Sequence, residues 1–296
     1  MIVNNTPRMS QIVLEVWKPL AVLFVWDVIV TVFYMSSSFR APSLPMTIFG
    51  TVLALFLGFR VNSAYERWWE GRQLWGLMIN ASRNLARAAV AFLPDDPPRA
   101  RDLKRSIALR QIAYVNALRC QLRRLGDCPE VYDMVSREEA AEPMSRVNAA
   151  NGFLDGTAKR IEEARRDGWI DTIQQTQMER ILVDIANAQG GMERLKNTPL
   201  PMQYRFFPSF FARIFCLLLP IGLVETLGWA TPVGSTLAGL MFLAALQIGD
   251  DLVDPFSNTV HDLPMNAMCR TIEIDLKQAI GDAAPEPVTP FKGVLR

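Results

Sequence analysis

The sequence predicts an all-α, polytopic membrane protein with a large polar helical region, and three observations support this. First, the apolar residues occur in blocks at residues 12–35, 44–59, 206–227 and 231–248. Second, residues 83–205 between those blocks are polar and rich in charge. Third, no stretch shows the apolar–polar alternation that is typical of strands. A hydrophobic content of 50% would also fit a soluble globule, so the distribution along the chain decides the fold class.

The first apolar block, residues 12–35, is long enough to cross a membrane, because a spanning helix needs about 20 mostly apolar residues. Glu15, Lys18 and Pro19 lie near its start, where a charged side chain can reach the interface. Asp27 lies deeper, and a carboxylate at that depth faces protein or water rather than lipid. We therefore expect Asp27 to be a hydrogen-bonded structural residue. The block has no small-residue cleavage site after it, so we expect no cleaved signal peptide.

The other apolar blocks complete a prediction of four transmembrane segments. Residues 44–59 are too short to span a bilayer alone, so we expect them to begin a longer helix that continues into water. The blocks at 206–227 and 231–248 are expected to form a helical hairpin with a tight connection at residues 228–232.

The predicted segments divide the chain into four parts. These are residues 1–93 with membrane segments 1 and 2, residues 94–205 as a helical cytosolic region, residues 206–253 with segments 3 and 4, and residues 254–296 as a cytosolic C-terminal segment. The PDDPP stretch at 94–98 marks the turn out of the long second helix. Helices are predicted at 101–125 and 178–197, the second of them broken near Gly190 and Gly191.

Basic residues near the segment ends predict the orientation in the cell inner (plasma) membrane. The loop between the first two segments carries only Arg40, whereas a series of arginines starting at Arg60 follows the second segment. The tail carries Arg270 and Lys277. We therefore expect a multi-pass protein with both termini in the cytosol.

Charge and cysteine content exclude several classes of protein. A formal net charge of +1 predicts no nucleic-acid partner. The four cysteines form no C-x-x-C pair, and Cys120 and Cys128 lie in the predicted cytosolic region, where thiols are kept reduced. We expect all four, including Cys216 and Cys269, to be reduced and structural.

One face of the second helix is a candidate wall for an ion path. At about 100° per residue, one line along that helix carries seven side chains: Ile48, Thr51, Leu55, Phe59, Ser63, Glu66 and Glu70. The line is apolar at membrane depth and acidic beyond it. Around the axis of an oligomer, such apolar rings gate a pore by dewetting and the acidic rings attract cations.

Two alternatives to this interpretation remain open. The apolar line can instead pack against the chain's own helices, as most apolar stripes do. Arg60, Arg67 and Arg72 can also pair with Glu66, with Glu70 or with acids on neighbouring helices, and pairing of the two glutamates would remove the acidic rings.

Three segments carry a family resemblance. Residues 58–76 read GFRVNSAYERWWEGRQLWG, residues 198–207 read TPLPMQYRFF, and residues 251–266 read DLVDPFSNTVHDLPMN. In this order they resemble the bestrophin family, and the chain looks like a prokaryotic homologue. The resemblance extends over about residues 10–275, although residues 95–165 match only in helical character.

The resemblance implies a homopentameric ion channel with a pore on the five-fold axis. It places the neck of the pore at Thr51, Leu55 and Phe59, the same line as the one obtained from helix geometry. It places a cytosolic aperture at Ile173, with Ile170 as the alternative because gaps affect the count. The implied partners are further copies of the chain, membrane lipid and permeant inorganic ions, and no cofactor is expected.

Two departures from the family pattern affect the expected properties. Thr51 stands where an apolar neck residue is expected, and a ring of hydroxyl groups is easier to wet. The acidic run of the calcium-binding animal members is replaced by residues 257–261, so only Asp254 and Asp262 supply carboxylates. Calcium takes six to eight oxygen ligands. We therefore predict a calcium-independent channel.

The function predicted from sequence is a bestrophin-like ion channel that is gated by the apolar neck and the aperture. Glu66 and Glu70 slightly favour cations, with a chloride or anion channel as the first alternative and a non-conducting scaffold as the second. An enzyme is not expected, because His261 is the only histidine and no catalytic constellation is present. We predict no metal site, because the acids at 250, 251, 254 and 262 lack EF-hand spacing and are expected to cap helices or pair between subunits.

Overall fold

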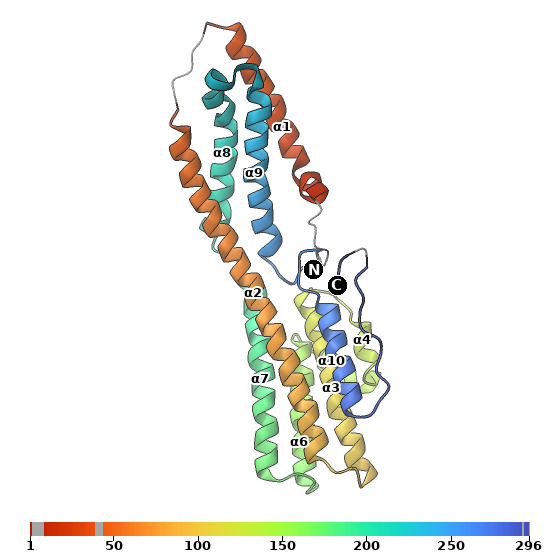
Figure 1. Ribbon diagram of the computed structural model, residues 1–296. Helices are drawn as coiled ribbons and strands as arrows, with labels where there is room; N and C mark the ends of the chain where they lie inside the picture. The colour runs from red at the N-terminus through yellow and green to blue at the C-terminus, as the bar shows by residue number, and fades with distance from the viewer. Residues whose placement is uncertain (2–8, 39–43, 292, 296) are drawn as a thin grey trace. The chain divides into compact units, whose positions relative to one another are not determined.

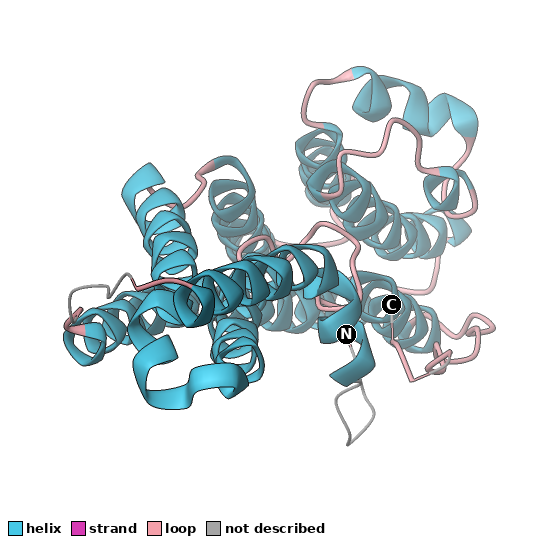
Figure 2. Cartoon of the chain, turned by 90° about the horizontal axis from the view of Figure 1, so that it is seen from above, coloured by secondary structure: helices cyan, strands magenta, loops and turns pink. Residues whose placement is uncertain are grey.

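A computed structural model describes residues 1, 9–38, 44–291 and 293–295, without the side chains of residues 9–15. Arg40 therefore lies outside the described residues. The helices are α1 (Met9–Ser36), α2 (Met46–Phe92), α3 (Pro98–Leu122), α4 (Pro129–Tyr132), α5 (Arg137–Ser145), α6 (Ala149–Arg166), α7 (Thr172–Asn197), α8 (Met202–Leu227), η1 (Gly228–Ala230), α9 (Thr231–Leu252) and α10 (Met265–Ala279). The all-helical prediction is confirmed over the described ranges (Figure 2), where the only β-type pairing is an isolated bridge between Phe291 and Val294.

The chain forms two compact units, and their boundary falls inside α2. The apolar unit consists of Asn4–Trp68 and Pro199–Asp254, and the polar unit consists of Met1–Val3, Trp69–Thr198 and Pro255–Arg296. Helix α2 is continuous for 47 residues with no internal proline, as predicted for residues 44–59 and their continuation. It ends at Phe92, just before the proline-rich stretch at 94–98.

The apolar unit contains α1, the first part of α2, α8 and α9 (Figure 1). Side chains from all four helices make its core, which contains Val16, Leu53, Leu57, Ala212, Phe215, Leu219, Leu243 and Leu246. Three stretches are long and apolar enough to cross a membrane: Val16–Ser36, Met46–Phe92 and Met202–Leu252. The last contains both α8 and α9.

A buried carboxylate joins α1 to α9 within the apolar unit. Asp27 is fully buried and accepts hydrogen bonds from Ser235 Oγ at 3.0 Å and Thr236 Oγ1 at 2.9 Å. A buried charged group is tolerated when hydrogen bonds replace its lost hydration. The predicted structural role of Asp27 is confirmed.

The connection between α8 and α9 is as short as the sequence predicts. The 3₁₀ turn η1 links them, and Gly228 adopts a φ of 52°, a conformation that side chains with a Cβ rarely adopt. Thr231 Oγ1 donates to the carbonyl oxygen of Gly228 at 2.7 Å and fixes the start of α9.

In the polar unit, α3 packs against α6, α7 and α10 (Figure 1). Helix α7 begins with a capping box, in which Asp171 Oδ1 accepts from the backbone N–H of Gln174 and the Gln174 side chain accepts from that of Asp171. The predicted break of this helix at Gly190 and Gly191 is wrong, since α7 runs through both. A Cβ on Gly191 would lie 2.6 Å from the Leu74 side chain, so this glycine permits close approach to α2 rather than ending α7.

Candidate functional site

The line of α2 that was predicted to form a pore neck is exposed with respect to the residues that the structure describes. Leu55 and Phe59 are 58% and 57% exposed, and Thr51 is also exposed. Leu53 and Leu57, on the other side of the helix, are 3% and 4% exposed and belong to the core. The alternative, in which the line through Leu55 and Phe59 packs inside the subunit, is therefore wrong. The face of α2 that packs there is the one with Leu53 and Leu57.

The Thr51 hydroxyl is directed by its own helix. Its Oγ1 donates to the carbonyl oxygen of Thr47 at 2.8 Å, an i−4 bond within the first turns of α2. The hydroxyl hydrogen is therefore used in this bond, and the oxygen can still accept hydrogen bonds on the exposed face of α2.

The two acids further along the same line differ in their partners. Glu66 accepts a hydrogen bond from Asn62 Nδ2 at 2.8 Å, on its own helix. Glu70 forms an ion pair with Arg194, with the Nη2 and Oε1 atoms 2.5 Å apart. An acidic residue beside a guanidinium has little net charge at a distance. Of the two acids, only Glu66 is without an ion pair to another residue that the structure describes.

Two of the three arginines that the sequence offered as partners, Arg60 and Arg67, make other contacts. Arg60 is buried and contacts Asp250 at 2.5 Å and Ser209 Oγ at 2.8 Å. Arg67 Nε donates to the carbonyl oxygen of Val253 at 3.0 Å. The pairing of Glu70 was foreseen, but its partner was not. Arg194 lies 124 residues away in sequence, and no local pattern indicates it.

The structure distinguishes the two candidates for the aperture by burial. Ile173, in the first turn of α7, is 70% exposed, whereas Ile170 is 4% exposed and packed in the polar unit. A side chain can narrow a path only if it projects from the protein surface. The geometry therefore favours Ile173 over Ile170.

Three of the acids at the end of α9 and beyond, at positions 250, 251 and 262, have partners within the chain. Asp250 pairs with Arg60, and Asp251 Oδ1 accepts from Gln247 Nε2 at 2.8 Å. Asp262 accepts from both the backbone N–H and the hydroxyl of Thr259, at 2.9 and 2.7 Å. These contacts fix a turn and give the carboxylates a structural role.

The prediction that all four cysteines are reduced is wrong for two of them. Cys120 and Cys128 form a disulfide with a Cα–Cα distance of 6.1 Å, within the usual range for such bonds. The turn between α3 and α4 brings Cys128 back against α3, and the eight-residue separation matches no thiol motif. Cys216 and Cys269 are free and buried, as expected.

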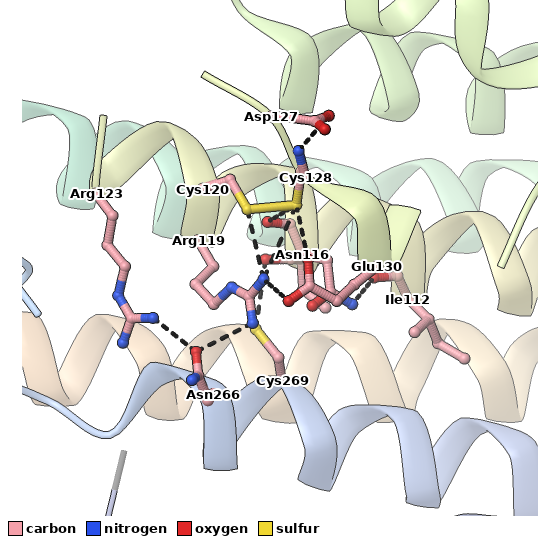
Figure 3. The surroundings of a disulfide bond; sticks show 11 residues. Ile112, Asn116, Arg119, Cys120, Arg123, Asp127, Cys128, Glu130, Asn266 and Cys269 are labelled. Atoms are coloured by element: carbon pink, nitrogen blue, oxygen red, sulfur yellow. Dashed lines mark hydrogen bonds and ion pairs between the residues drawn. A yellow bond between two sulfur atoms is a disulfide. The ribbon is translucent and has the colours of Figure 1, made fainter. Parts of the chain in front are cut away.

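A guanidinium group occupies the space beside this disulfide (Figure 3). Cys120, Cys128 and Glu130 are the one group of His, Cys, Asp and Glu side chains, among residues the structure describes, with the spacing of a metal site. Arg119 Nη2 lies 2.7 Å from Glu130 Oε1 and 3.4 Å from Cys120 Sγ, and Nη1 donates to Asn266 Oδ1 at 3.0 Å. With its sulfurs joined and its carboxylate paired with Arg119, this cluster has no ligand set for a cation.

Known proteins are similar to this chain in sequence and in fold. The model of the family described as Bacterial/Fungal Bestrophin protein matches residues 6–278. The voltage-dependent anion channel-forming protein mll4386 of Mesorhizobium japonicum is 35% identical over 242 residues, which is 82% of this chain and 76% of that protein. The voltage-dependent anion channel-forming protein YneE of Escherichia coli is 33% identical over 83% of this chain and 80% of its own length.

Solved structures agree with the sequence comparisons. A point mutant of a bacterial bestrophin homologue from Klebsiella pneumoniae superposes with a TM-score of 0.84 at 30% identity, over 90% of this chain and 100% of that one. The homologue from the same organism that was solved by Zn-SAD phasing gives a TM-score of 0.83 at 30% identity, over 89% and 98% of the two chains. The chain is therefore a member of the bacterial and fungal bestrophin family.

Proposed function

We propose that this chain forms an anion-conducting channel, as a homopentamer around a central pore in the inner membrane. Its membership of the bestrophin family points to an ion channel and not to an enzyme. The observation that carries the proposal is the exposure of Leu55 and Phe59 on a helix whose opposite face is buried. An apolar face without a partner in the single chain needs lipid or further subunits to cover it.

Other exposed apolar surfaces of the apolar unit support self-association. A groove of about 530 Å³ between α2 and α8 is lined by side chains that include Val52, Phe56, Phe211 and Ile214. Four exposed phenylalanines on α8 stack or pack against one another at its edge: Phe206, Phe207, Phe210 and Phe211. Aromatic residues are enriched in protein interfaces, and neighbouring subunits with lipid between them would cover this surface.

We propose that the channel selects anions, whereas the sequence slightly favoured cations. The curated relatives carry names that describe anion channels. The main argument for cations was the acidic pair Glu66 and Glu70, and the charge of Glu70 is offset by Arg194. Leu55 and Phe59 provide a narrow apolar neck that gates by dewetting, and Ile173 provides a second constriction.

Four membrane crossings are proposed, by α1, the first part of α2, α8 and α9, with both termini in the cytosol. The polar unit contains both termini, and the Met1 amino group donates to the carbonyl oxygen of Leu295 at 2.7 Å. This contact supports the same side of the membrane for the two ends. Calcium-independent activity is part of the proposal, because Asp262 is already committed to the turn at Thr259.

The test is an ion-flux measurement on purified protein in liposomes, followed by reversal potentials in planar bilayers under a KCl gradient. The proposal predicts current that reverses near the chloride equilibrium potential. Reversal near the potassium potential would identify a cation channel, and absence of current would favour a non-conducting scaffold. Either result would contradict the proposed function.

A further inference from the structure

The ion pair between Glu70 and Arg194 joins the two helices, α2 and α7, on which the proposed neck and the proposed aperture lie. The two side chains are 40% and 67% exposed, so the pair is in contact with solvent. Glu70 belongs to α2, the helix of Leu55 and Phe59, and Arg194 belongs to α7, the helix of Ile173.

In ideal helix geometry, positions 59 and 70 of α2 fall on nearly the same line, because eleven residues at about 100° each complete about three turns. The two residues are eleven positions apart on one uninterrupted helix, which is about three turns and about 16 Å along the axis. If Phe59 faces the ion path, Glu70 faces the same side further along the helix.

On α7, Arg194 and Ile173 share the exposed side. The buried residues of α7 lie on its other side and include Met178, Leu182, Ile185 and Met192. The exposed side carries Arg180 and Asp184 between Ile173 and Arg194. These two have opposite charges one turn apart, so their fields largely offset each other along this face.

The field of Glu70 therefore depends on Arg194. An isolated ring of carboxylates raises the local concentration of cations and repels anions. A carboxylate with a guanidinium nitrogen at 2.5 Å acts instead as a compact dipole, whose potential falls off much faster with distance. Repeated in every subunit, Arg194 would convert an acidic ring into a nearly neutral one.

We propose that Arg194 is a specificity-determining residue of the channel: its guanidinium neutralises Glu70 and so permits anions to pass a position that would otherwise select cations. This inference rests on the proposed anion channel. It names Arg194 as the residue that determines whether the channel selects anions or cations.

The experiment compares reversal potentials of four proteins in planar bilayers under a KCl gradient. They are the wild type, Arg194→Gln, Arg194→Lys, and the double variant Glu70→Gln with Arg194→Gln. We expect Arg194→Gln to lower the chloride-to-potassium permeability ratio by about threefold or more, because the carboxylate ring is then unmasked. Arg194→Lys retains the charge, and the double variant removes both charges, so both should remain close to the wild type. The shift in Arg194→Gln should shrink at about 1 M salt, where the Debye length is about 3 Å.

A matched control removes a positive charge that faces a different acid. Arg166 on α6 is 72% exposed and lies 3.7 Å from Glu162, so Arg166→Gln changes the net charge equally without touching Glu70. Its permeability ratio should equal that of the wild type.

The outcomes separate this inference from the proposed function. A wild type that is silent or cation-selective overturns the proposed function and the role of Arg194 with it. An anion-selective wild type with an unchanged Arg194→Gln ratio overturns the role of Arg194 alone. The same holds if the double variant stays shifted, since the effect is then structural rather than electrostatic.

Discussion

Leu55 and Leu57 are two residues apart on α2 and lie in opposite environments, one 58% exposed and the other 4% exposed in the core. Because a helix turns by about 100° per residue, these positions face different sides. One side belongs to the core of the apolar unit, and the other is the side that we propose to line the ion path.

Substitution of Leu55 by alanine should raise channel conductance with little loss of stability. The smaller side chain widens and wets an apolar constriction, and an exposed leucine contributes little packing within the subunit. Leu57→Ala is the matched control. It should lower the free energy of unfolding by about 2–5 kcal/mol, as a core leucine does, without a comparable gain in conductance. Single-channel recordings and thermal unfolding of both variants check this, and equal conductances for Leu55→Ala and the wild type would contradict it.

Removal of the Asp27 carboxylate should destabilise the packing of α1 against α9. In Asp27→Ala, the hydroxyls of Ser235 and Thr236 lose their acceptor inside the apolar unit. A buried polar group left without a partner costs about 1–3 kcal/mol. Thermal unfolding in detergent should show the loss, whereas the permeability ratio should not change because Asp27 is fully buried. A change in selectivity with unchanged stability would show that Asp27 acts in conduction instead.

The disulfide predicts a definite thiol count in the purified protein. Without reductant, unfolded protein should react with two equivalents of a thiol reagent, from Cys216 and Cys269, and after reduction with four. Cys120→Ser should lower stability by about 2.5 kcal/mol, as expected for a loop of this length. Four reactive thiols before reduction would rule out the bond.

Cys269 should resist alkylation in the folded protein. Burial raises the pKa of its thiol to about 12, above the usual value of about 8.5. At about pH 8 the thiol therefore stays protonated and is a poor nucleophile, and the folded protein gains reactivity only as the pH rises toward about 12. Mass spectrometry after iodoacetamide treatment under mildly alkaline conditions should find no label on Cys269 until the protein is unfolded. Rapid labelling of the folded protein would contradict the buried position.

Chelation of calcium should leave the current unchanged. Asp262 holds a turn, since both of its carboxylate oxygens accept hydrogen bonds from Thr259. Bilayer currents recorded before and after addition of a strong chelator compare the two conditions in one membrane. A large loss of current on chelation, restored by added calcium, would require a calcium site that these residues do not provide.

Local patterns predicted much of this structure, because helical periodicity is a property of neighbouring residues. The line through Thr51, Leu55 and Phe59 and the short connection at Gly228 follow from local spacing, whereas the exposure of that line required the structure. Spacing from a distant motif tolerates gaps and left Ile173 and Ile170 open as aperture residues; the exposure of Ile173 favours it, and the aperture itself stays a prediction.

Contacts that depend on how the chain folds back on itself were beyond the reach of such patterns. The Cys120–Cys128 bond depends on how the chain turns after α3. The role of Gly191 depends on Leu74 in another helix, and the charge of the exposed α2 face depends on Arg194. In each case the contact involves a residue on another helix, or a residue that a turn of the chain brings back.

Whether ions pass the side chain of Leu55 can be measured directly with a cysteine at that position. In Leu55→Cys, a charged methanethiosulfonate reagent added to an open channel in a bilayer should reduce the current, since the modified side chains would obstruct the neck. The native free cysteines, Cys216 and Cys269, are buried, so the wild type should not respond. A Leu55→Cys current that persists unchanged, with mass spectrometry showing that the cysteine was modified, would place Leu55 outside the ion path.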